Sequence, residues 1–306
     1  MSVRKRAEKE LEKEHKKELR KTRNRAIIGT AVAVERAMHK KHAMERKRNR
    51  AALGAAVVVA KGISWRKAHR KQDEAAEAEP SMEQVPFEAE RAAIIECALE
   101  MRDNALIKGS GGNVSMRVPG AGPDGADAFL VTPSAMDYDT MLPSDVVLID
   151  GNGATLDGCR RPTSDMTAIL YIFRNMPEVN VVIHTHQPYA TALGLVADEL
   201  PADFTTVIDE LHAAVHVAPF TRSSDEGMGV LTVEHIGDAL AVILKHHGVI
   251  AVGKSIDQAL TAAIYIEESC QAYLAALATG LPIAHLTPEQ IADESEERGY
   301  YGQPEE

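Results

Sequence analysis

The spacing of hydrophobic residues first becomes regular near Phe87. From Phe87 to Ile107 apolar side chains recur every three or four residues, as on one face of a helix. The short apolar runs at 128–132 and 146–149 instead have the length and composition of strands. Helix and strand patterns therefore follow one another in this half of the chain.

The alternation continues to the end of the patterned region. A helical run follows Ser164 as far as Met176, and the β-branched run 179–183 predicts a strand. A further helical stretch follows Pro188. Ser255 is placed to cap a long, alanine-rich helix that reaches residue 278. These elements predict an α/β fold, and the apolar share of 45% is sufficient for a large core.

The charge of the chain divides it into two parts. Residues 1–72 contain 23 Lys and Arg against 7 Asp and Glu, whereas residues 73–306 contain 11 against 38. The head therefore carries about +16 and the body about −27. Residues 72–86 change the sign of the charge and include two prolines, which favours a linker. We expect a basic extension at 1–85 and a catalytic domain at 86–306.

The basic extension contains an internal repeat. The segment 23–34, a basic cluster followed by a short Ala/Val patch, recurs at 48–59. Such a pattern suits a helix that docks its apolar side on a partner, and a docking or encapsulation peptide for a protein shell or scaffold is one hypothesis. An arm that packs on the enzyme's own acidic body is the alternative. The repeat's basic clusters lack interleaved aromatic residues, which argues against nucleic-acid binding.

Cysteine usage and hydropathy both point to a cytoplasmic protein. Cys97, Cys159 and Cys270 are odd in number and far apart, a pattern that indicates free thiols rather than a disulfide framework. No apolar run approaches the roughly 20 residues that a membrane-spanning helix needs. We therefore expect neither a disulfide nor a transmembrane segment.

Three histidines stand at the ends of apolar runs. His184 and His186 are two residues apart at the end of the predicted strand, so that their imidazoles leave the same face. His247 ends a second apolar run. Three imidazoles that converge on one ion leave a fourth position open, as catalytic zinc sites require. A pair of histidines alone is more often structural, so the third one carries the prediction.

Two segments could bind an anion. The glycine-rich run 109–115 allows its backbone N–H groups to approach a phosphate closely. The run 162–165 places hydroxyls at a predicted helix start, where a phosphate is also favoured. Asp165, in the same run, could move a proton if it lies near a metal and a substrate. An ordinary helix N-cap is the alternative for this run.

Taken together, these motifs resemble the class II aldolase/adducin family. The resemblance covers 87–303 and excludes the basic extension. The motifs that match, in the family's order and spacing, are 111–115 (GGNVS), 132–134 (TPS), 137–139 (DYD), 162–165 (PTSD), 184–186 (HTH), 246–248 (HHG) and 300–303 (YYGQ).

The resemblance implies a three-layer α/β/α fold around a mainly antiparallel sheet, and a homotetramer with active sites shared between subunits. It implies Zn²⁺, or another divalent metal, on His184, His186 and His247. It also implies that Asp165 acts as acid or base, and that Tyr301 of a neighbouring subunit exchanges a proton with the aldehyde oxygen. The residues implied to hold the substrate phosphate are Gly112, Asn113, Ser134, Thr163 and Ser164.

The implied reaction is retro-aldol cleavage of a small phosphorylated ketose through an enediolate. A ribulose-phosphate 4-epimerase, which breaks the same bond, is the alternative. Asp165, where fuculose-phosphate-type aldolases have Glu, and the 300–303 ending favour the epimerase, whereas 207–211 and 217–220 resemble the aldolase branch. A non-catalytic, adducin-like interaction module is the second alternative. Ala135 stands where the family usually has Gly, and Thr163 where it has Ser.

Overall fold

The computed structural model of the protein describes residues 85–298. The chain divides into two units, Met1–Ser81 and Met82–Glu306, and every described residue belongs to the second. The repeat at 23–34 and 48–59, most of the linker and Tyr301 lie outside the described residues. None of the described helices is both long and apolar enough to cross a membrane.

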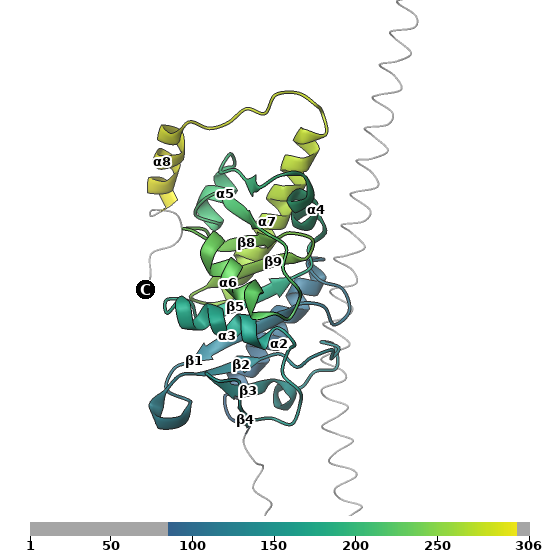
Figure 1. Cartoon of the computed structure of the whole chain (residues 1–306), viewed down its shortest axis with the longest axis vertical. Coiled ribbons are helices and arrows are strands. Elements are labelled where there is room, and N and C mark those ends of the chain that lie inside the picture. The colour runs from purple at the N-terminus through teal and green to yellow at the C-terminus, as the bar shows by residue number, and fades with distance from the viewer. Residues whose placement is uncertain (1–84, 299–306) are drawn as a thin grey trace, which may run out of the picture. The chain divides into compact units, whose positions relative to one another are not determined.

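A nine-stranded sheet forms the centre of the described unit (Figure 1). Its spatial order is β4-β3-β2-β1-β5-β9-β8-β7-β6, and every pairing is antiparallel except that of β7 with β8. The strands are β1 (Asn113–Val118), β2 (Ala128–Val131), β3 (Val147–Asp150), β4 (Thr155–Asp157), β5 (Val181–Thr185), β6 (Glu199–Leu200), β7 (Val215–Ala218), β8 (Ala241–Leu244) and β9 (Gly248–Gly253).

Helices cover both faces of this sheet. One face packs against α2, α4, α5 and α7, and the other against α3 and α6. The α-helices are α2 (Glu88–Asp103), α3 (Met166–Asn175), α4 (Pro188–Val196), α5 (Thr205–Glu210), α6 (Glu226–His235), α7 (Ile256–Leu277) and α8 (Pro288–Glu297). Short 3₁₀ helices lie at η1 (Pro123–Gly125) and η2 (Pro143–Asp145). The predicted three-layer α/β/α architecture is confirmed.

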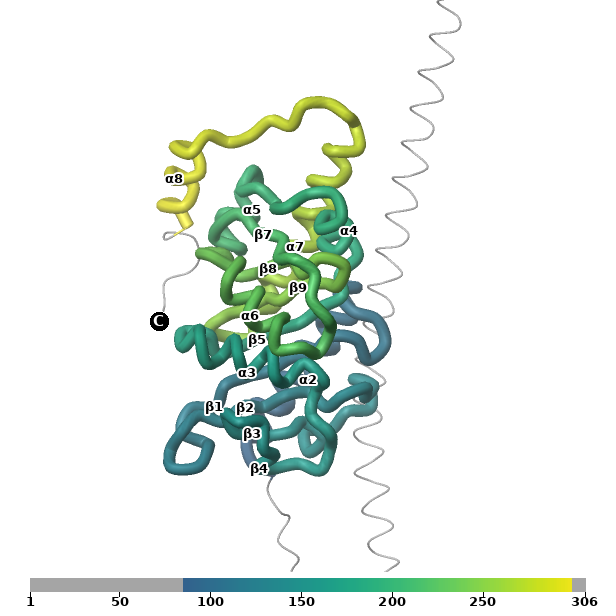
Figure 2. Tube along the Cα trace, viewed as in Figure 1, coloured from purple at the N-terminus to yellow at the C-terminus, as the bar shows by residue number. Residues whose placement is uncertain are grey.

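The two cores arise from the alternation of side chains along each strand. In β5, Val181 and Ile183 enter the core beneath α7, whereas Val182 enters the core beneath α3. The strands are apolar on both sides because helices cover both faces, so they read as short continuous apolar runs. A long extended connection separates α7 from the last helix, α8 (Figure 2). Arg298 ties the end of α8 to the domain by donating to the Ile208 carbonyl at 3.0 Å.

Most predicted elements are confirmed within two or three residues at their ends. Ser255 is the N-cap of α7, and its hydroxyl accepts from the Gln258 N–H. One prediction is wrong in detail: α3 begins at Met166 with Asp165 rather than Ser164 in the N-cap position. His246 and His247, which follow an apolar run in the sequence, both lie in the turn between β8 and β9.

A fully buried arginine joins the first helix to the edge of the sheet. The Arg91 Nε donates to the Pro86 carbonyl at 2.7 Å, and its Nη1 donates to the Val146 carbonyl. Its Nη2 pairs with the Asp157 carboxylate on β4. Burial of a guanidinium is tolerated only because each of its polar edges finds a partner.

We predict that Arg91→Met lowers the free energy of unfolding by about 3 kcal/mol, because buried carbonyls and Asp157 lose their partner. Urea unfolding followed by circular dichroism measures the change. Arg174→Met is the control, since the Arg174 side chain is exposed and pairs with Glu226 at 3.8 Å, a contact worth well under about 1 kcal/mol. Equal losses in the two variants would contradict the anchoring role of Arg91.

Candidate active site

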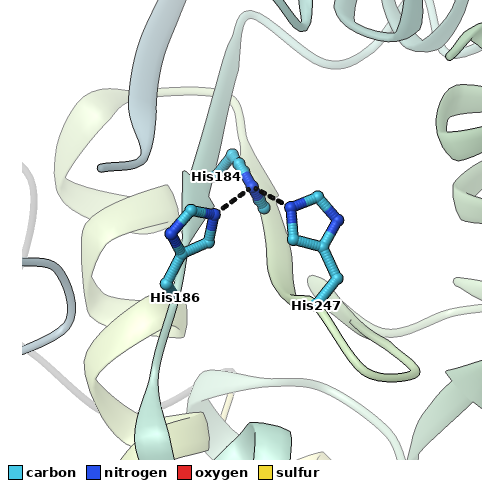
Figure 3. Close-up of side chains that lie close together, drawn as sticks. All are labelled: His184, His186 and His247. Atoms are coloured by element: carbon cyan, nitrogen blue, oxygen red, sulfur yellow. Dashed lines mark hydrogen bonds between the residues drawn. The ribbon is translucent and has the colours of Figure 1, made fainter. Parts of the chain in front are cut away.

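Three imidazoles converge at one end of the central strands (Figure 3). β5 carries His184 and is followed directly by His186, and the turn between β8 and β9 carries His247. The Nε2 of His184 lies 3.0 Å from the Nε2 of His186 and 3.2 Å from that of His247. The pairing of β5 with β9 thus brings the three residues together in space, although they are far apart in the sequence.

The hydrogen bond of His184 fixes which of its nitrogens carries the proton. Its Nδ1 lies 2.9 Å from the Val249 carbonyl, which can only accept, so Nδ1 is the donor and Nε2 presents a lone pair. Burial lowers the pKa of His184 to about 4. Burial likewise lowers the pKa values of His186 and His247. At neutral pH all three rings are therefore neutral, as metal ligands must be.

The three Nε2 atoms fit a divalent metal. Nitrogens at the usual Zn–N length on a tetrahedral ion lie about 3.3 Å apart, close to the spacings at His184. Neutral imidazole lone pairs at this distance repel one another unless a cation lies between them. Of the groups of histidine, cysteine and acidic residues in the described part of the chain, this triad is the one with ligand geometry. The convergence predicted from sequence is confirmed.

Two glycines allow the backbone to pack closely behind the triad. A Cβ on Gly248 would lie 2.0 Å from the Thr185 carbonyl oxygen. A Cβ on Gly112 would lie 2.5 Å from the His184 carbonyl oxygen, and Gly112 also has φ +73°. The hydroxyl of buried Tyr138 donates to the Gly112 carbonyl at 2.8 Å and holds the glycine-rich turn in place. Only glycine fits at either position.

A pocket of about 270 Å³ opens beside the triad. It joins the histidines to both segments that were predicted to bind an anion, and to Asp165 between them. No lysine or arginine is among its lining residues in the described part of the chain. The residues that line it are Ser110, Gly111, Gly112, Asn113, Pro133, Ser134, Ala135, Thr163, Ser164, Asp165, His186, Ser223, Ser224 and His247.

Asp165 is held from two sides within this pocket. Asn113 Nδ2 donates to its Oδ2 at 2.7 Å, and Ser224 Oγ donates to its Oδ1 at 3.2 Å. The Asp165 side chain makes no capping bond to α3, although the residue occupies the N-cap position. Burial lowers the pKa of each of the three histidines, and the negative charge of Asp165 partly opposes this lowering, so the carboxylate lies within electrostatic reach of them. The capping alternative is therefore excluded for the side chain.

Comparison with known proteins identifies this arrangement. Residues 92–274 match the family described as Class II Aldolase and Adducin N-terminal domain. The chain belongs to this family. It is 31% identical over 213 residues to an L-fuculose phosphate aldolase of Escherichia coli, covering 68% of this chain and 94% of the relative. It is 32% identical over 196 residues to a 5-deoxy-D-ribulose 1-phosphate aldolase of Bacillus thuringiensis, covering 64% of this chain and 89% of that one.

A solved structure of an L-fuculose 1-phosphate aldolase superposes with a TM-score of 0.62 at 26% identity. The match covers 68% of this chain and 94% of that one. The basic extension has no counterpart in the family match, which begins at residue 92. The fold of this chain and its histidine triad are therefore both consistent with the class II aldolase family.

Departures from the usual class II aldolase pattern can be placed in the structure. Ala135, where the family usually has Gly, has φ +53°, so this position does require the left-handed conformation and the alanine adopts it at a cost. Thr163 is buried, and its Oγ1 accepts from the Asp165 N–H at 3.4 Å. Asp209, an acidic residue in the 207–211 segment that resembles the aldolase branch, lies on α5 and does not line the pocket.

Sequence reasoning missed Ser223 and Ser224. They lie in the loop between β7 and α6, outside every motif that carried the family resemblance. The local signal is the N-cap Asp225, whose side chain accepts from the Gly227 N–H, and this predicts a helix start only. None of His212, His216, His235 and His246 lines the pocket.

We predict that Gly112→Ala lowers the free energy of unfolding by about 4 kcal/mol, since the new Cβ combines left-handed strain with overlap onto the His184 carbonyl. Gly109→Ala is the matched control. Gly109 has φ +59° but nothing within 4 Å of its Cβ position, so the same change costs only about 1 kcal/mol there. Denaturant unfolding of both variants compares the two, and similar losses would contradict the close approach.

Proposed function

We propose that the protein is a zinc-dependent aldolase that cleaves a small ketose 1-phosphate into a three-carbon ketose phosphate and an aldehyde. The observation that carries this proposal is that one pocket is lined by two metal-site histidines, a carboxylate and two hydroxyl-rich anion segments. The names of the relatives in Escherichia coli and Bacillus thuringiensis supply the substrate class, a phosphorylated five- or six-carbon ketose.

The phosphate end of the substrate would lie against the hydroxyl-rich wall. Ser134, Thr163 and Ser164 offer hydroxyls, and Gly112 offers backbone that approaches without a side chain. Asn113 completes the wall, although its Nδ2 donates to Asp165 in this structure. Because the lining contains no lysine or arginine, neutral donors would bind the dianion.

The reacting end would lie between the triad and Asp165. A divalent cation on His184, His186 and His247 supplies, when bound, a Lewis acid for the ketose carbonyl and its neighbouring hydroxyl. Asp165 would hold or deliver the proton at the carbon that becomes nucleophilic when the carbon–carbon bond breaks. Asn113 and Ser224 would keep the carboxylate aimed at that carbon, since each donates to one of its oxygens.

Tyr301 would exchange a proton with the oxygen that becomes the aldehyde, from a neighbouring subunit of a homotetramer. The residue lies outside the described part of the chain, which ends three residues earlier at Arg298. The basic extension, with its repeat, would serve as a docking or assembly arm for a protein shell or scaffold. Its deletion would leave turnover intact under this proposal.

A 4-epimerase is the second candidate, and the observation that favours it is Asp165 in place of the longer Glu. An epimerase breaks the same bond, retains the aldehyde and adds it back on the opposite face. A shorter carboxylate leaves more room beside the triad in which a retained aldehyde could turn. A non-catalytic adducin-like module is the third candidate and would not need the convergent triad.

We expect zinc-loaded protein to release a three-carbon ketose phosphate and an aldehyde from at least one ketose 1-phosphate in a panel of ketose 1-phosphates and 5-phosphates followed by NMR. Retention of the carbon skeleton with inversion at C4 would show that the protein is an epimerase and not an aldolase. No conversion of any substrate by fully metal-loaded protein would favour the interaction module.

His184→Ala is expected to remove both metal and activity, because His184 lies between the other two ligands, with its Nε2 3.0 Å from that of His186 and 3.2 Å from that of His247. Metal content after dialysis and turnover are the two measurements. His216→Ala is the control, since His216 is exposed and contacts Glu199 and the His235 carbonyl away from the pocket. Preserved activity in His184→Ala would refute the ligand assignment.

Ser224→Ala should lower kcat about 10-fold with metal content unchanged, because Asp165 loses one of its side-chain donors and a hydrogen bond to a charged group is worth about 1.5 kcal/mol. Ser223→Ala is the matched control, as Ser223 lines the same pocket without a hydrogen bond to Asp165. A larger effect at Ser223 than at Ser224 would show that the loop contacts substrate rather than orienting Asp165.

A further inference from the structure

The residues between and after the first two histidines face away from the metal. Side chains alternate along β5, so Thr185 points to the face covered by α7, opposite to that of His184. Gln187 continues this alternation past the end of the strand. Both Thr185 and Gln187 are fully buried, with 0% exposure. A buried amide and a buried hydroxyl at this point need partners.

The two side chains bond to each other, and Gln187 also bonds to α7. Thr185 Oγ1 donates to Gln187 Oε1 at 2.9 Å, and Gln187 Nε2 donates to the Ala263 carbonyl of α7. Gln187 is the N-cap residue of α4, yet its side chain makes no capping bond there. Its amide instead connects the end of β5 to the middle of α7.

Glu267 supplies the cap that Gln187 does not. It lies four residues after Ala263, hence one turn further along the same face of α7. Its two carboxylate oxygens accept from the Tyr189 N–H at 2.9 Å and the Ala190 N–H at 3.0 Å. These are first-turn N–H groups of α4 that have no partner within their own helix. A negative charge at this helix N-terminus is also favourable.

His186 is held by fewer hydrogen bonds than His184, the histidine that lies within β5. His184 belongs to the strand ladder on both sides, and its Nδ1 donates to the Val249 carbonyl. His186 follows the last strand residue, and its backbone N–H reaches the Leu106 carbonyl at 3.2 Å. Among the described residues no hydrogen bond holds its Nδ1. Metal-bound histidines usually have such an outer partner.

We propose that Gln187 and Glu267 are positioning residues of the metal centre, which fasten the β5–α4 junction to α7 and so hold His186 at ligand distance from His184. The proposal rests on the metal centre of the proposed function but not on its substrate. The contacts of α7 with Gln187, Tyr189 and Ala190 replace the side-chain hydrogen bond that His186 lacks.

Metal affinity of the full-length protein tests the proposal. Gln187→Met and Glu267→Ala should each weaken Zn²⁺ binding about 10-fold or more in competition with a chelator, as removal of outer partners does elsewhere. Glu267→Gln keeps one acceptor and should lose less than Glu267→Ala. Glu268→Gln, at the exposed neighbouring position on α7, should bind Zn²⁺ as the unaltered protein does. The visible absorption spectrum of the Co²⁺ form should shift in the first two variants.

Unchanged Zn²⁺ affinity and an unchanged Co²⁺ spectrum in folded Gln187→Met and Glu267→Ala would overturn the proposal, even if thermal stability falls. A loss of stability alone would mean that α7 supports the fold and not the ligand. Because no substrate enters these measurements, a protein that binds metal tightly yet cleaves no ketose phosphate would refute the proposed function and leave this inference standing.

Discussion

The arrangement of the site depends on the register of β5, which pairs with β1 on one side and β9 on the other. This double pairing sets Asn113 opposite His184, and His184 opposite Ile250. A shift by one residue would turn His184 and His186 toward α7 and bring Thr185 to the pocket side. The register of β5 therefore determines which side chains face the pocket as metal ligands and which face α7. Gly112 and Gly248 allow the neighbouring backbone to follow the strand closely enough to maintain both.

Much of the fold and the metal site could be predicted from local patterns. The strand ending in His184 and His186 and the helix capped by Ser255 each follow from a few neighbouring residues. The order of the family motifs then assigned His247 to the same site, although it lies 63 residues after His184. These predictions succeeded because alternation and capping act over short distances.

The remaining contacts could not be predicted because they connect distant segments through single hydrogen bonds. Ser224 reaches Asp165 across 59 residues, and Glu267 reaches Tyr189 across 78. Neither pair has a local pattern that distinguishes it from an exposed serine or a helix-surface glutamate. The turn conformation of His246 was also missed, since an apolar run that ends in two histidines looks like a continuous strand until the sheet register is known.

The lack of lysine and arginine in the pocket lining of the described residues has a kinetic consequence. Residues 73–306 carry 38 acidic side chains against 11 basic ones, and no lysine or arginine among the described residues lines the pocket. A doubly charged ligand thus diffuses toward a surface of the same sign, with the local attraction confined to whatever ion the histidines hold. Screening by salt weakens the long-range repulsion more than the short-range attraction. Ionic strength should therefore accelerate capture of an anion by this domain, the reverse of steering by a basic cleft.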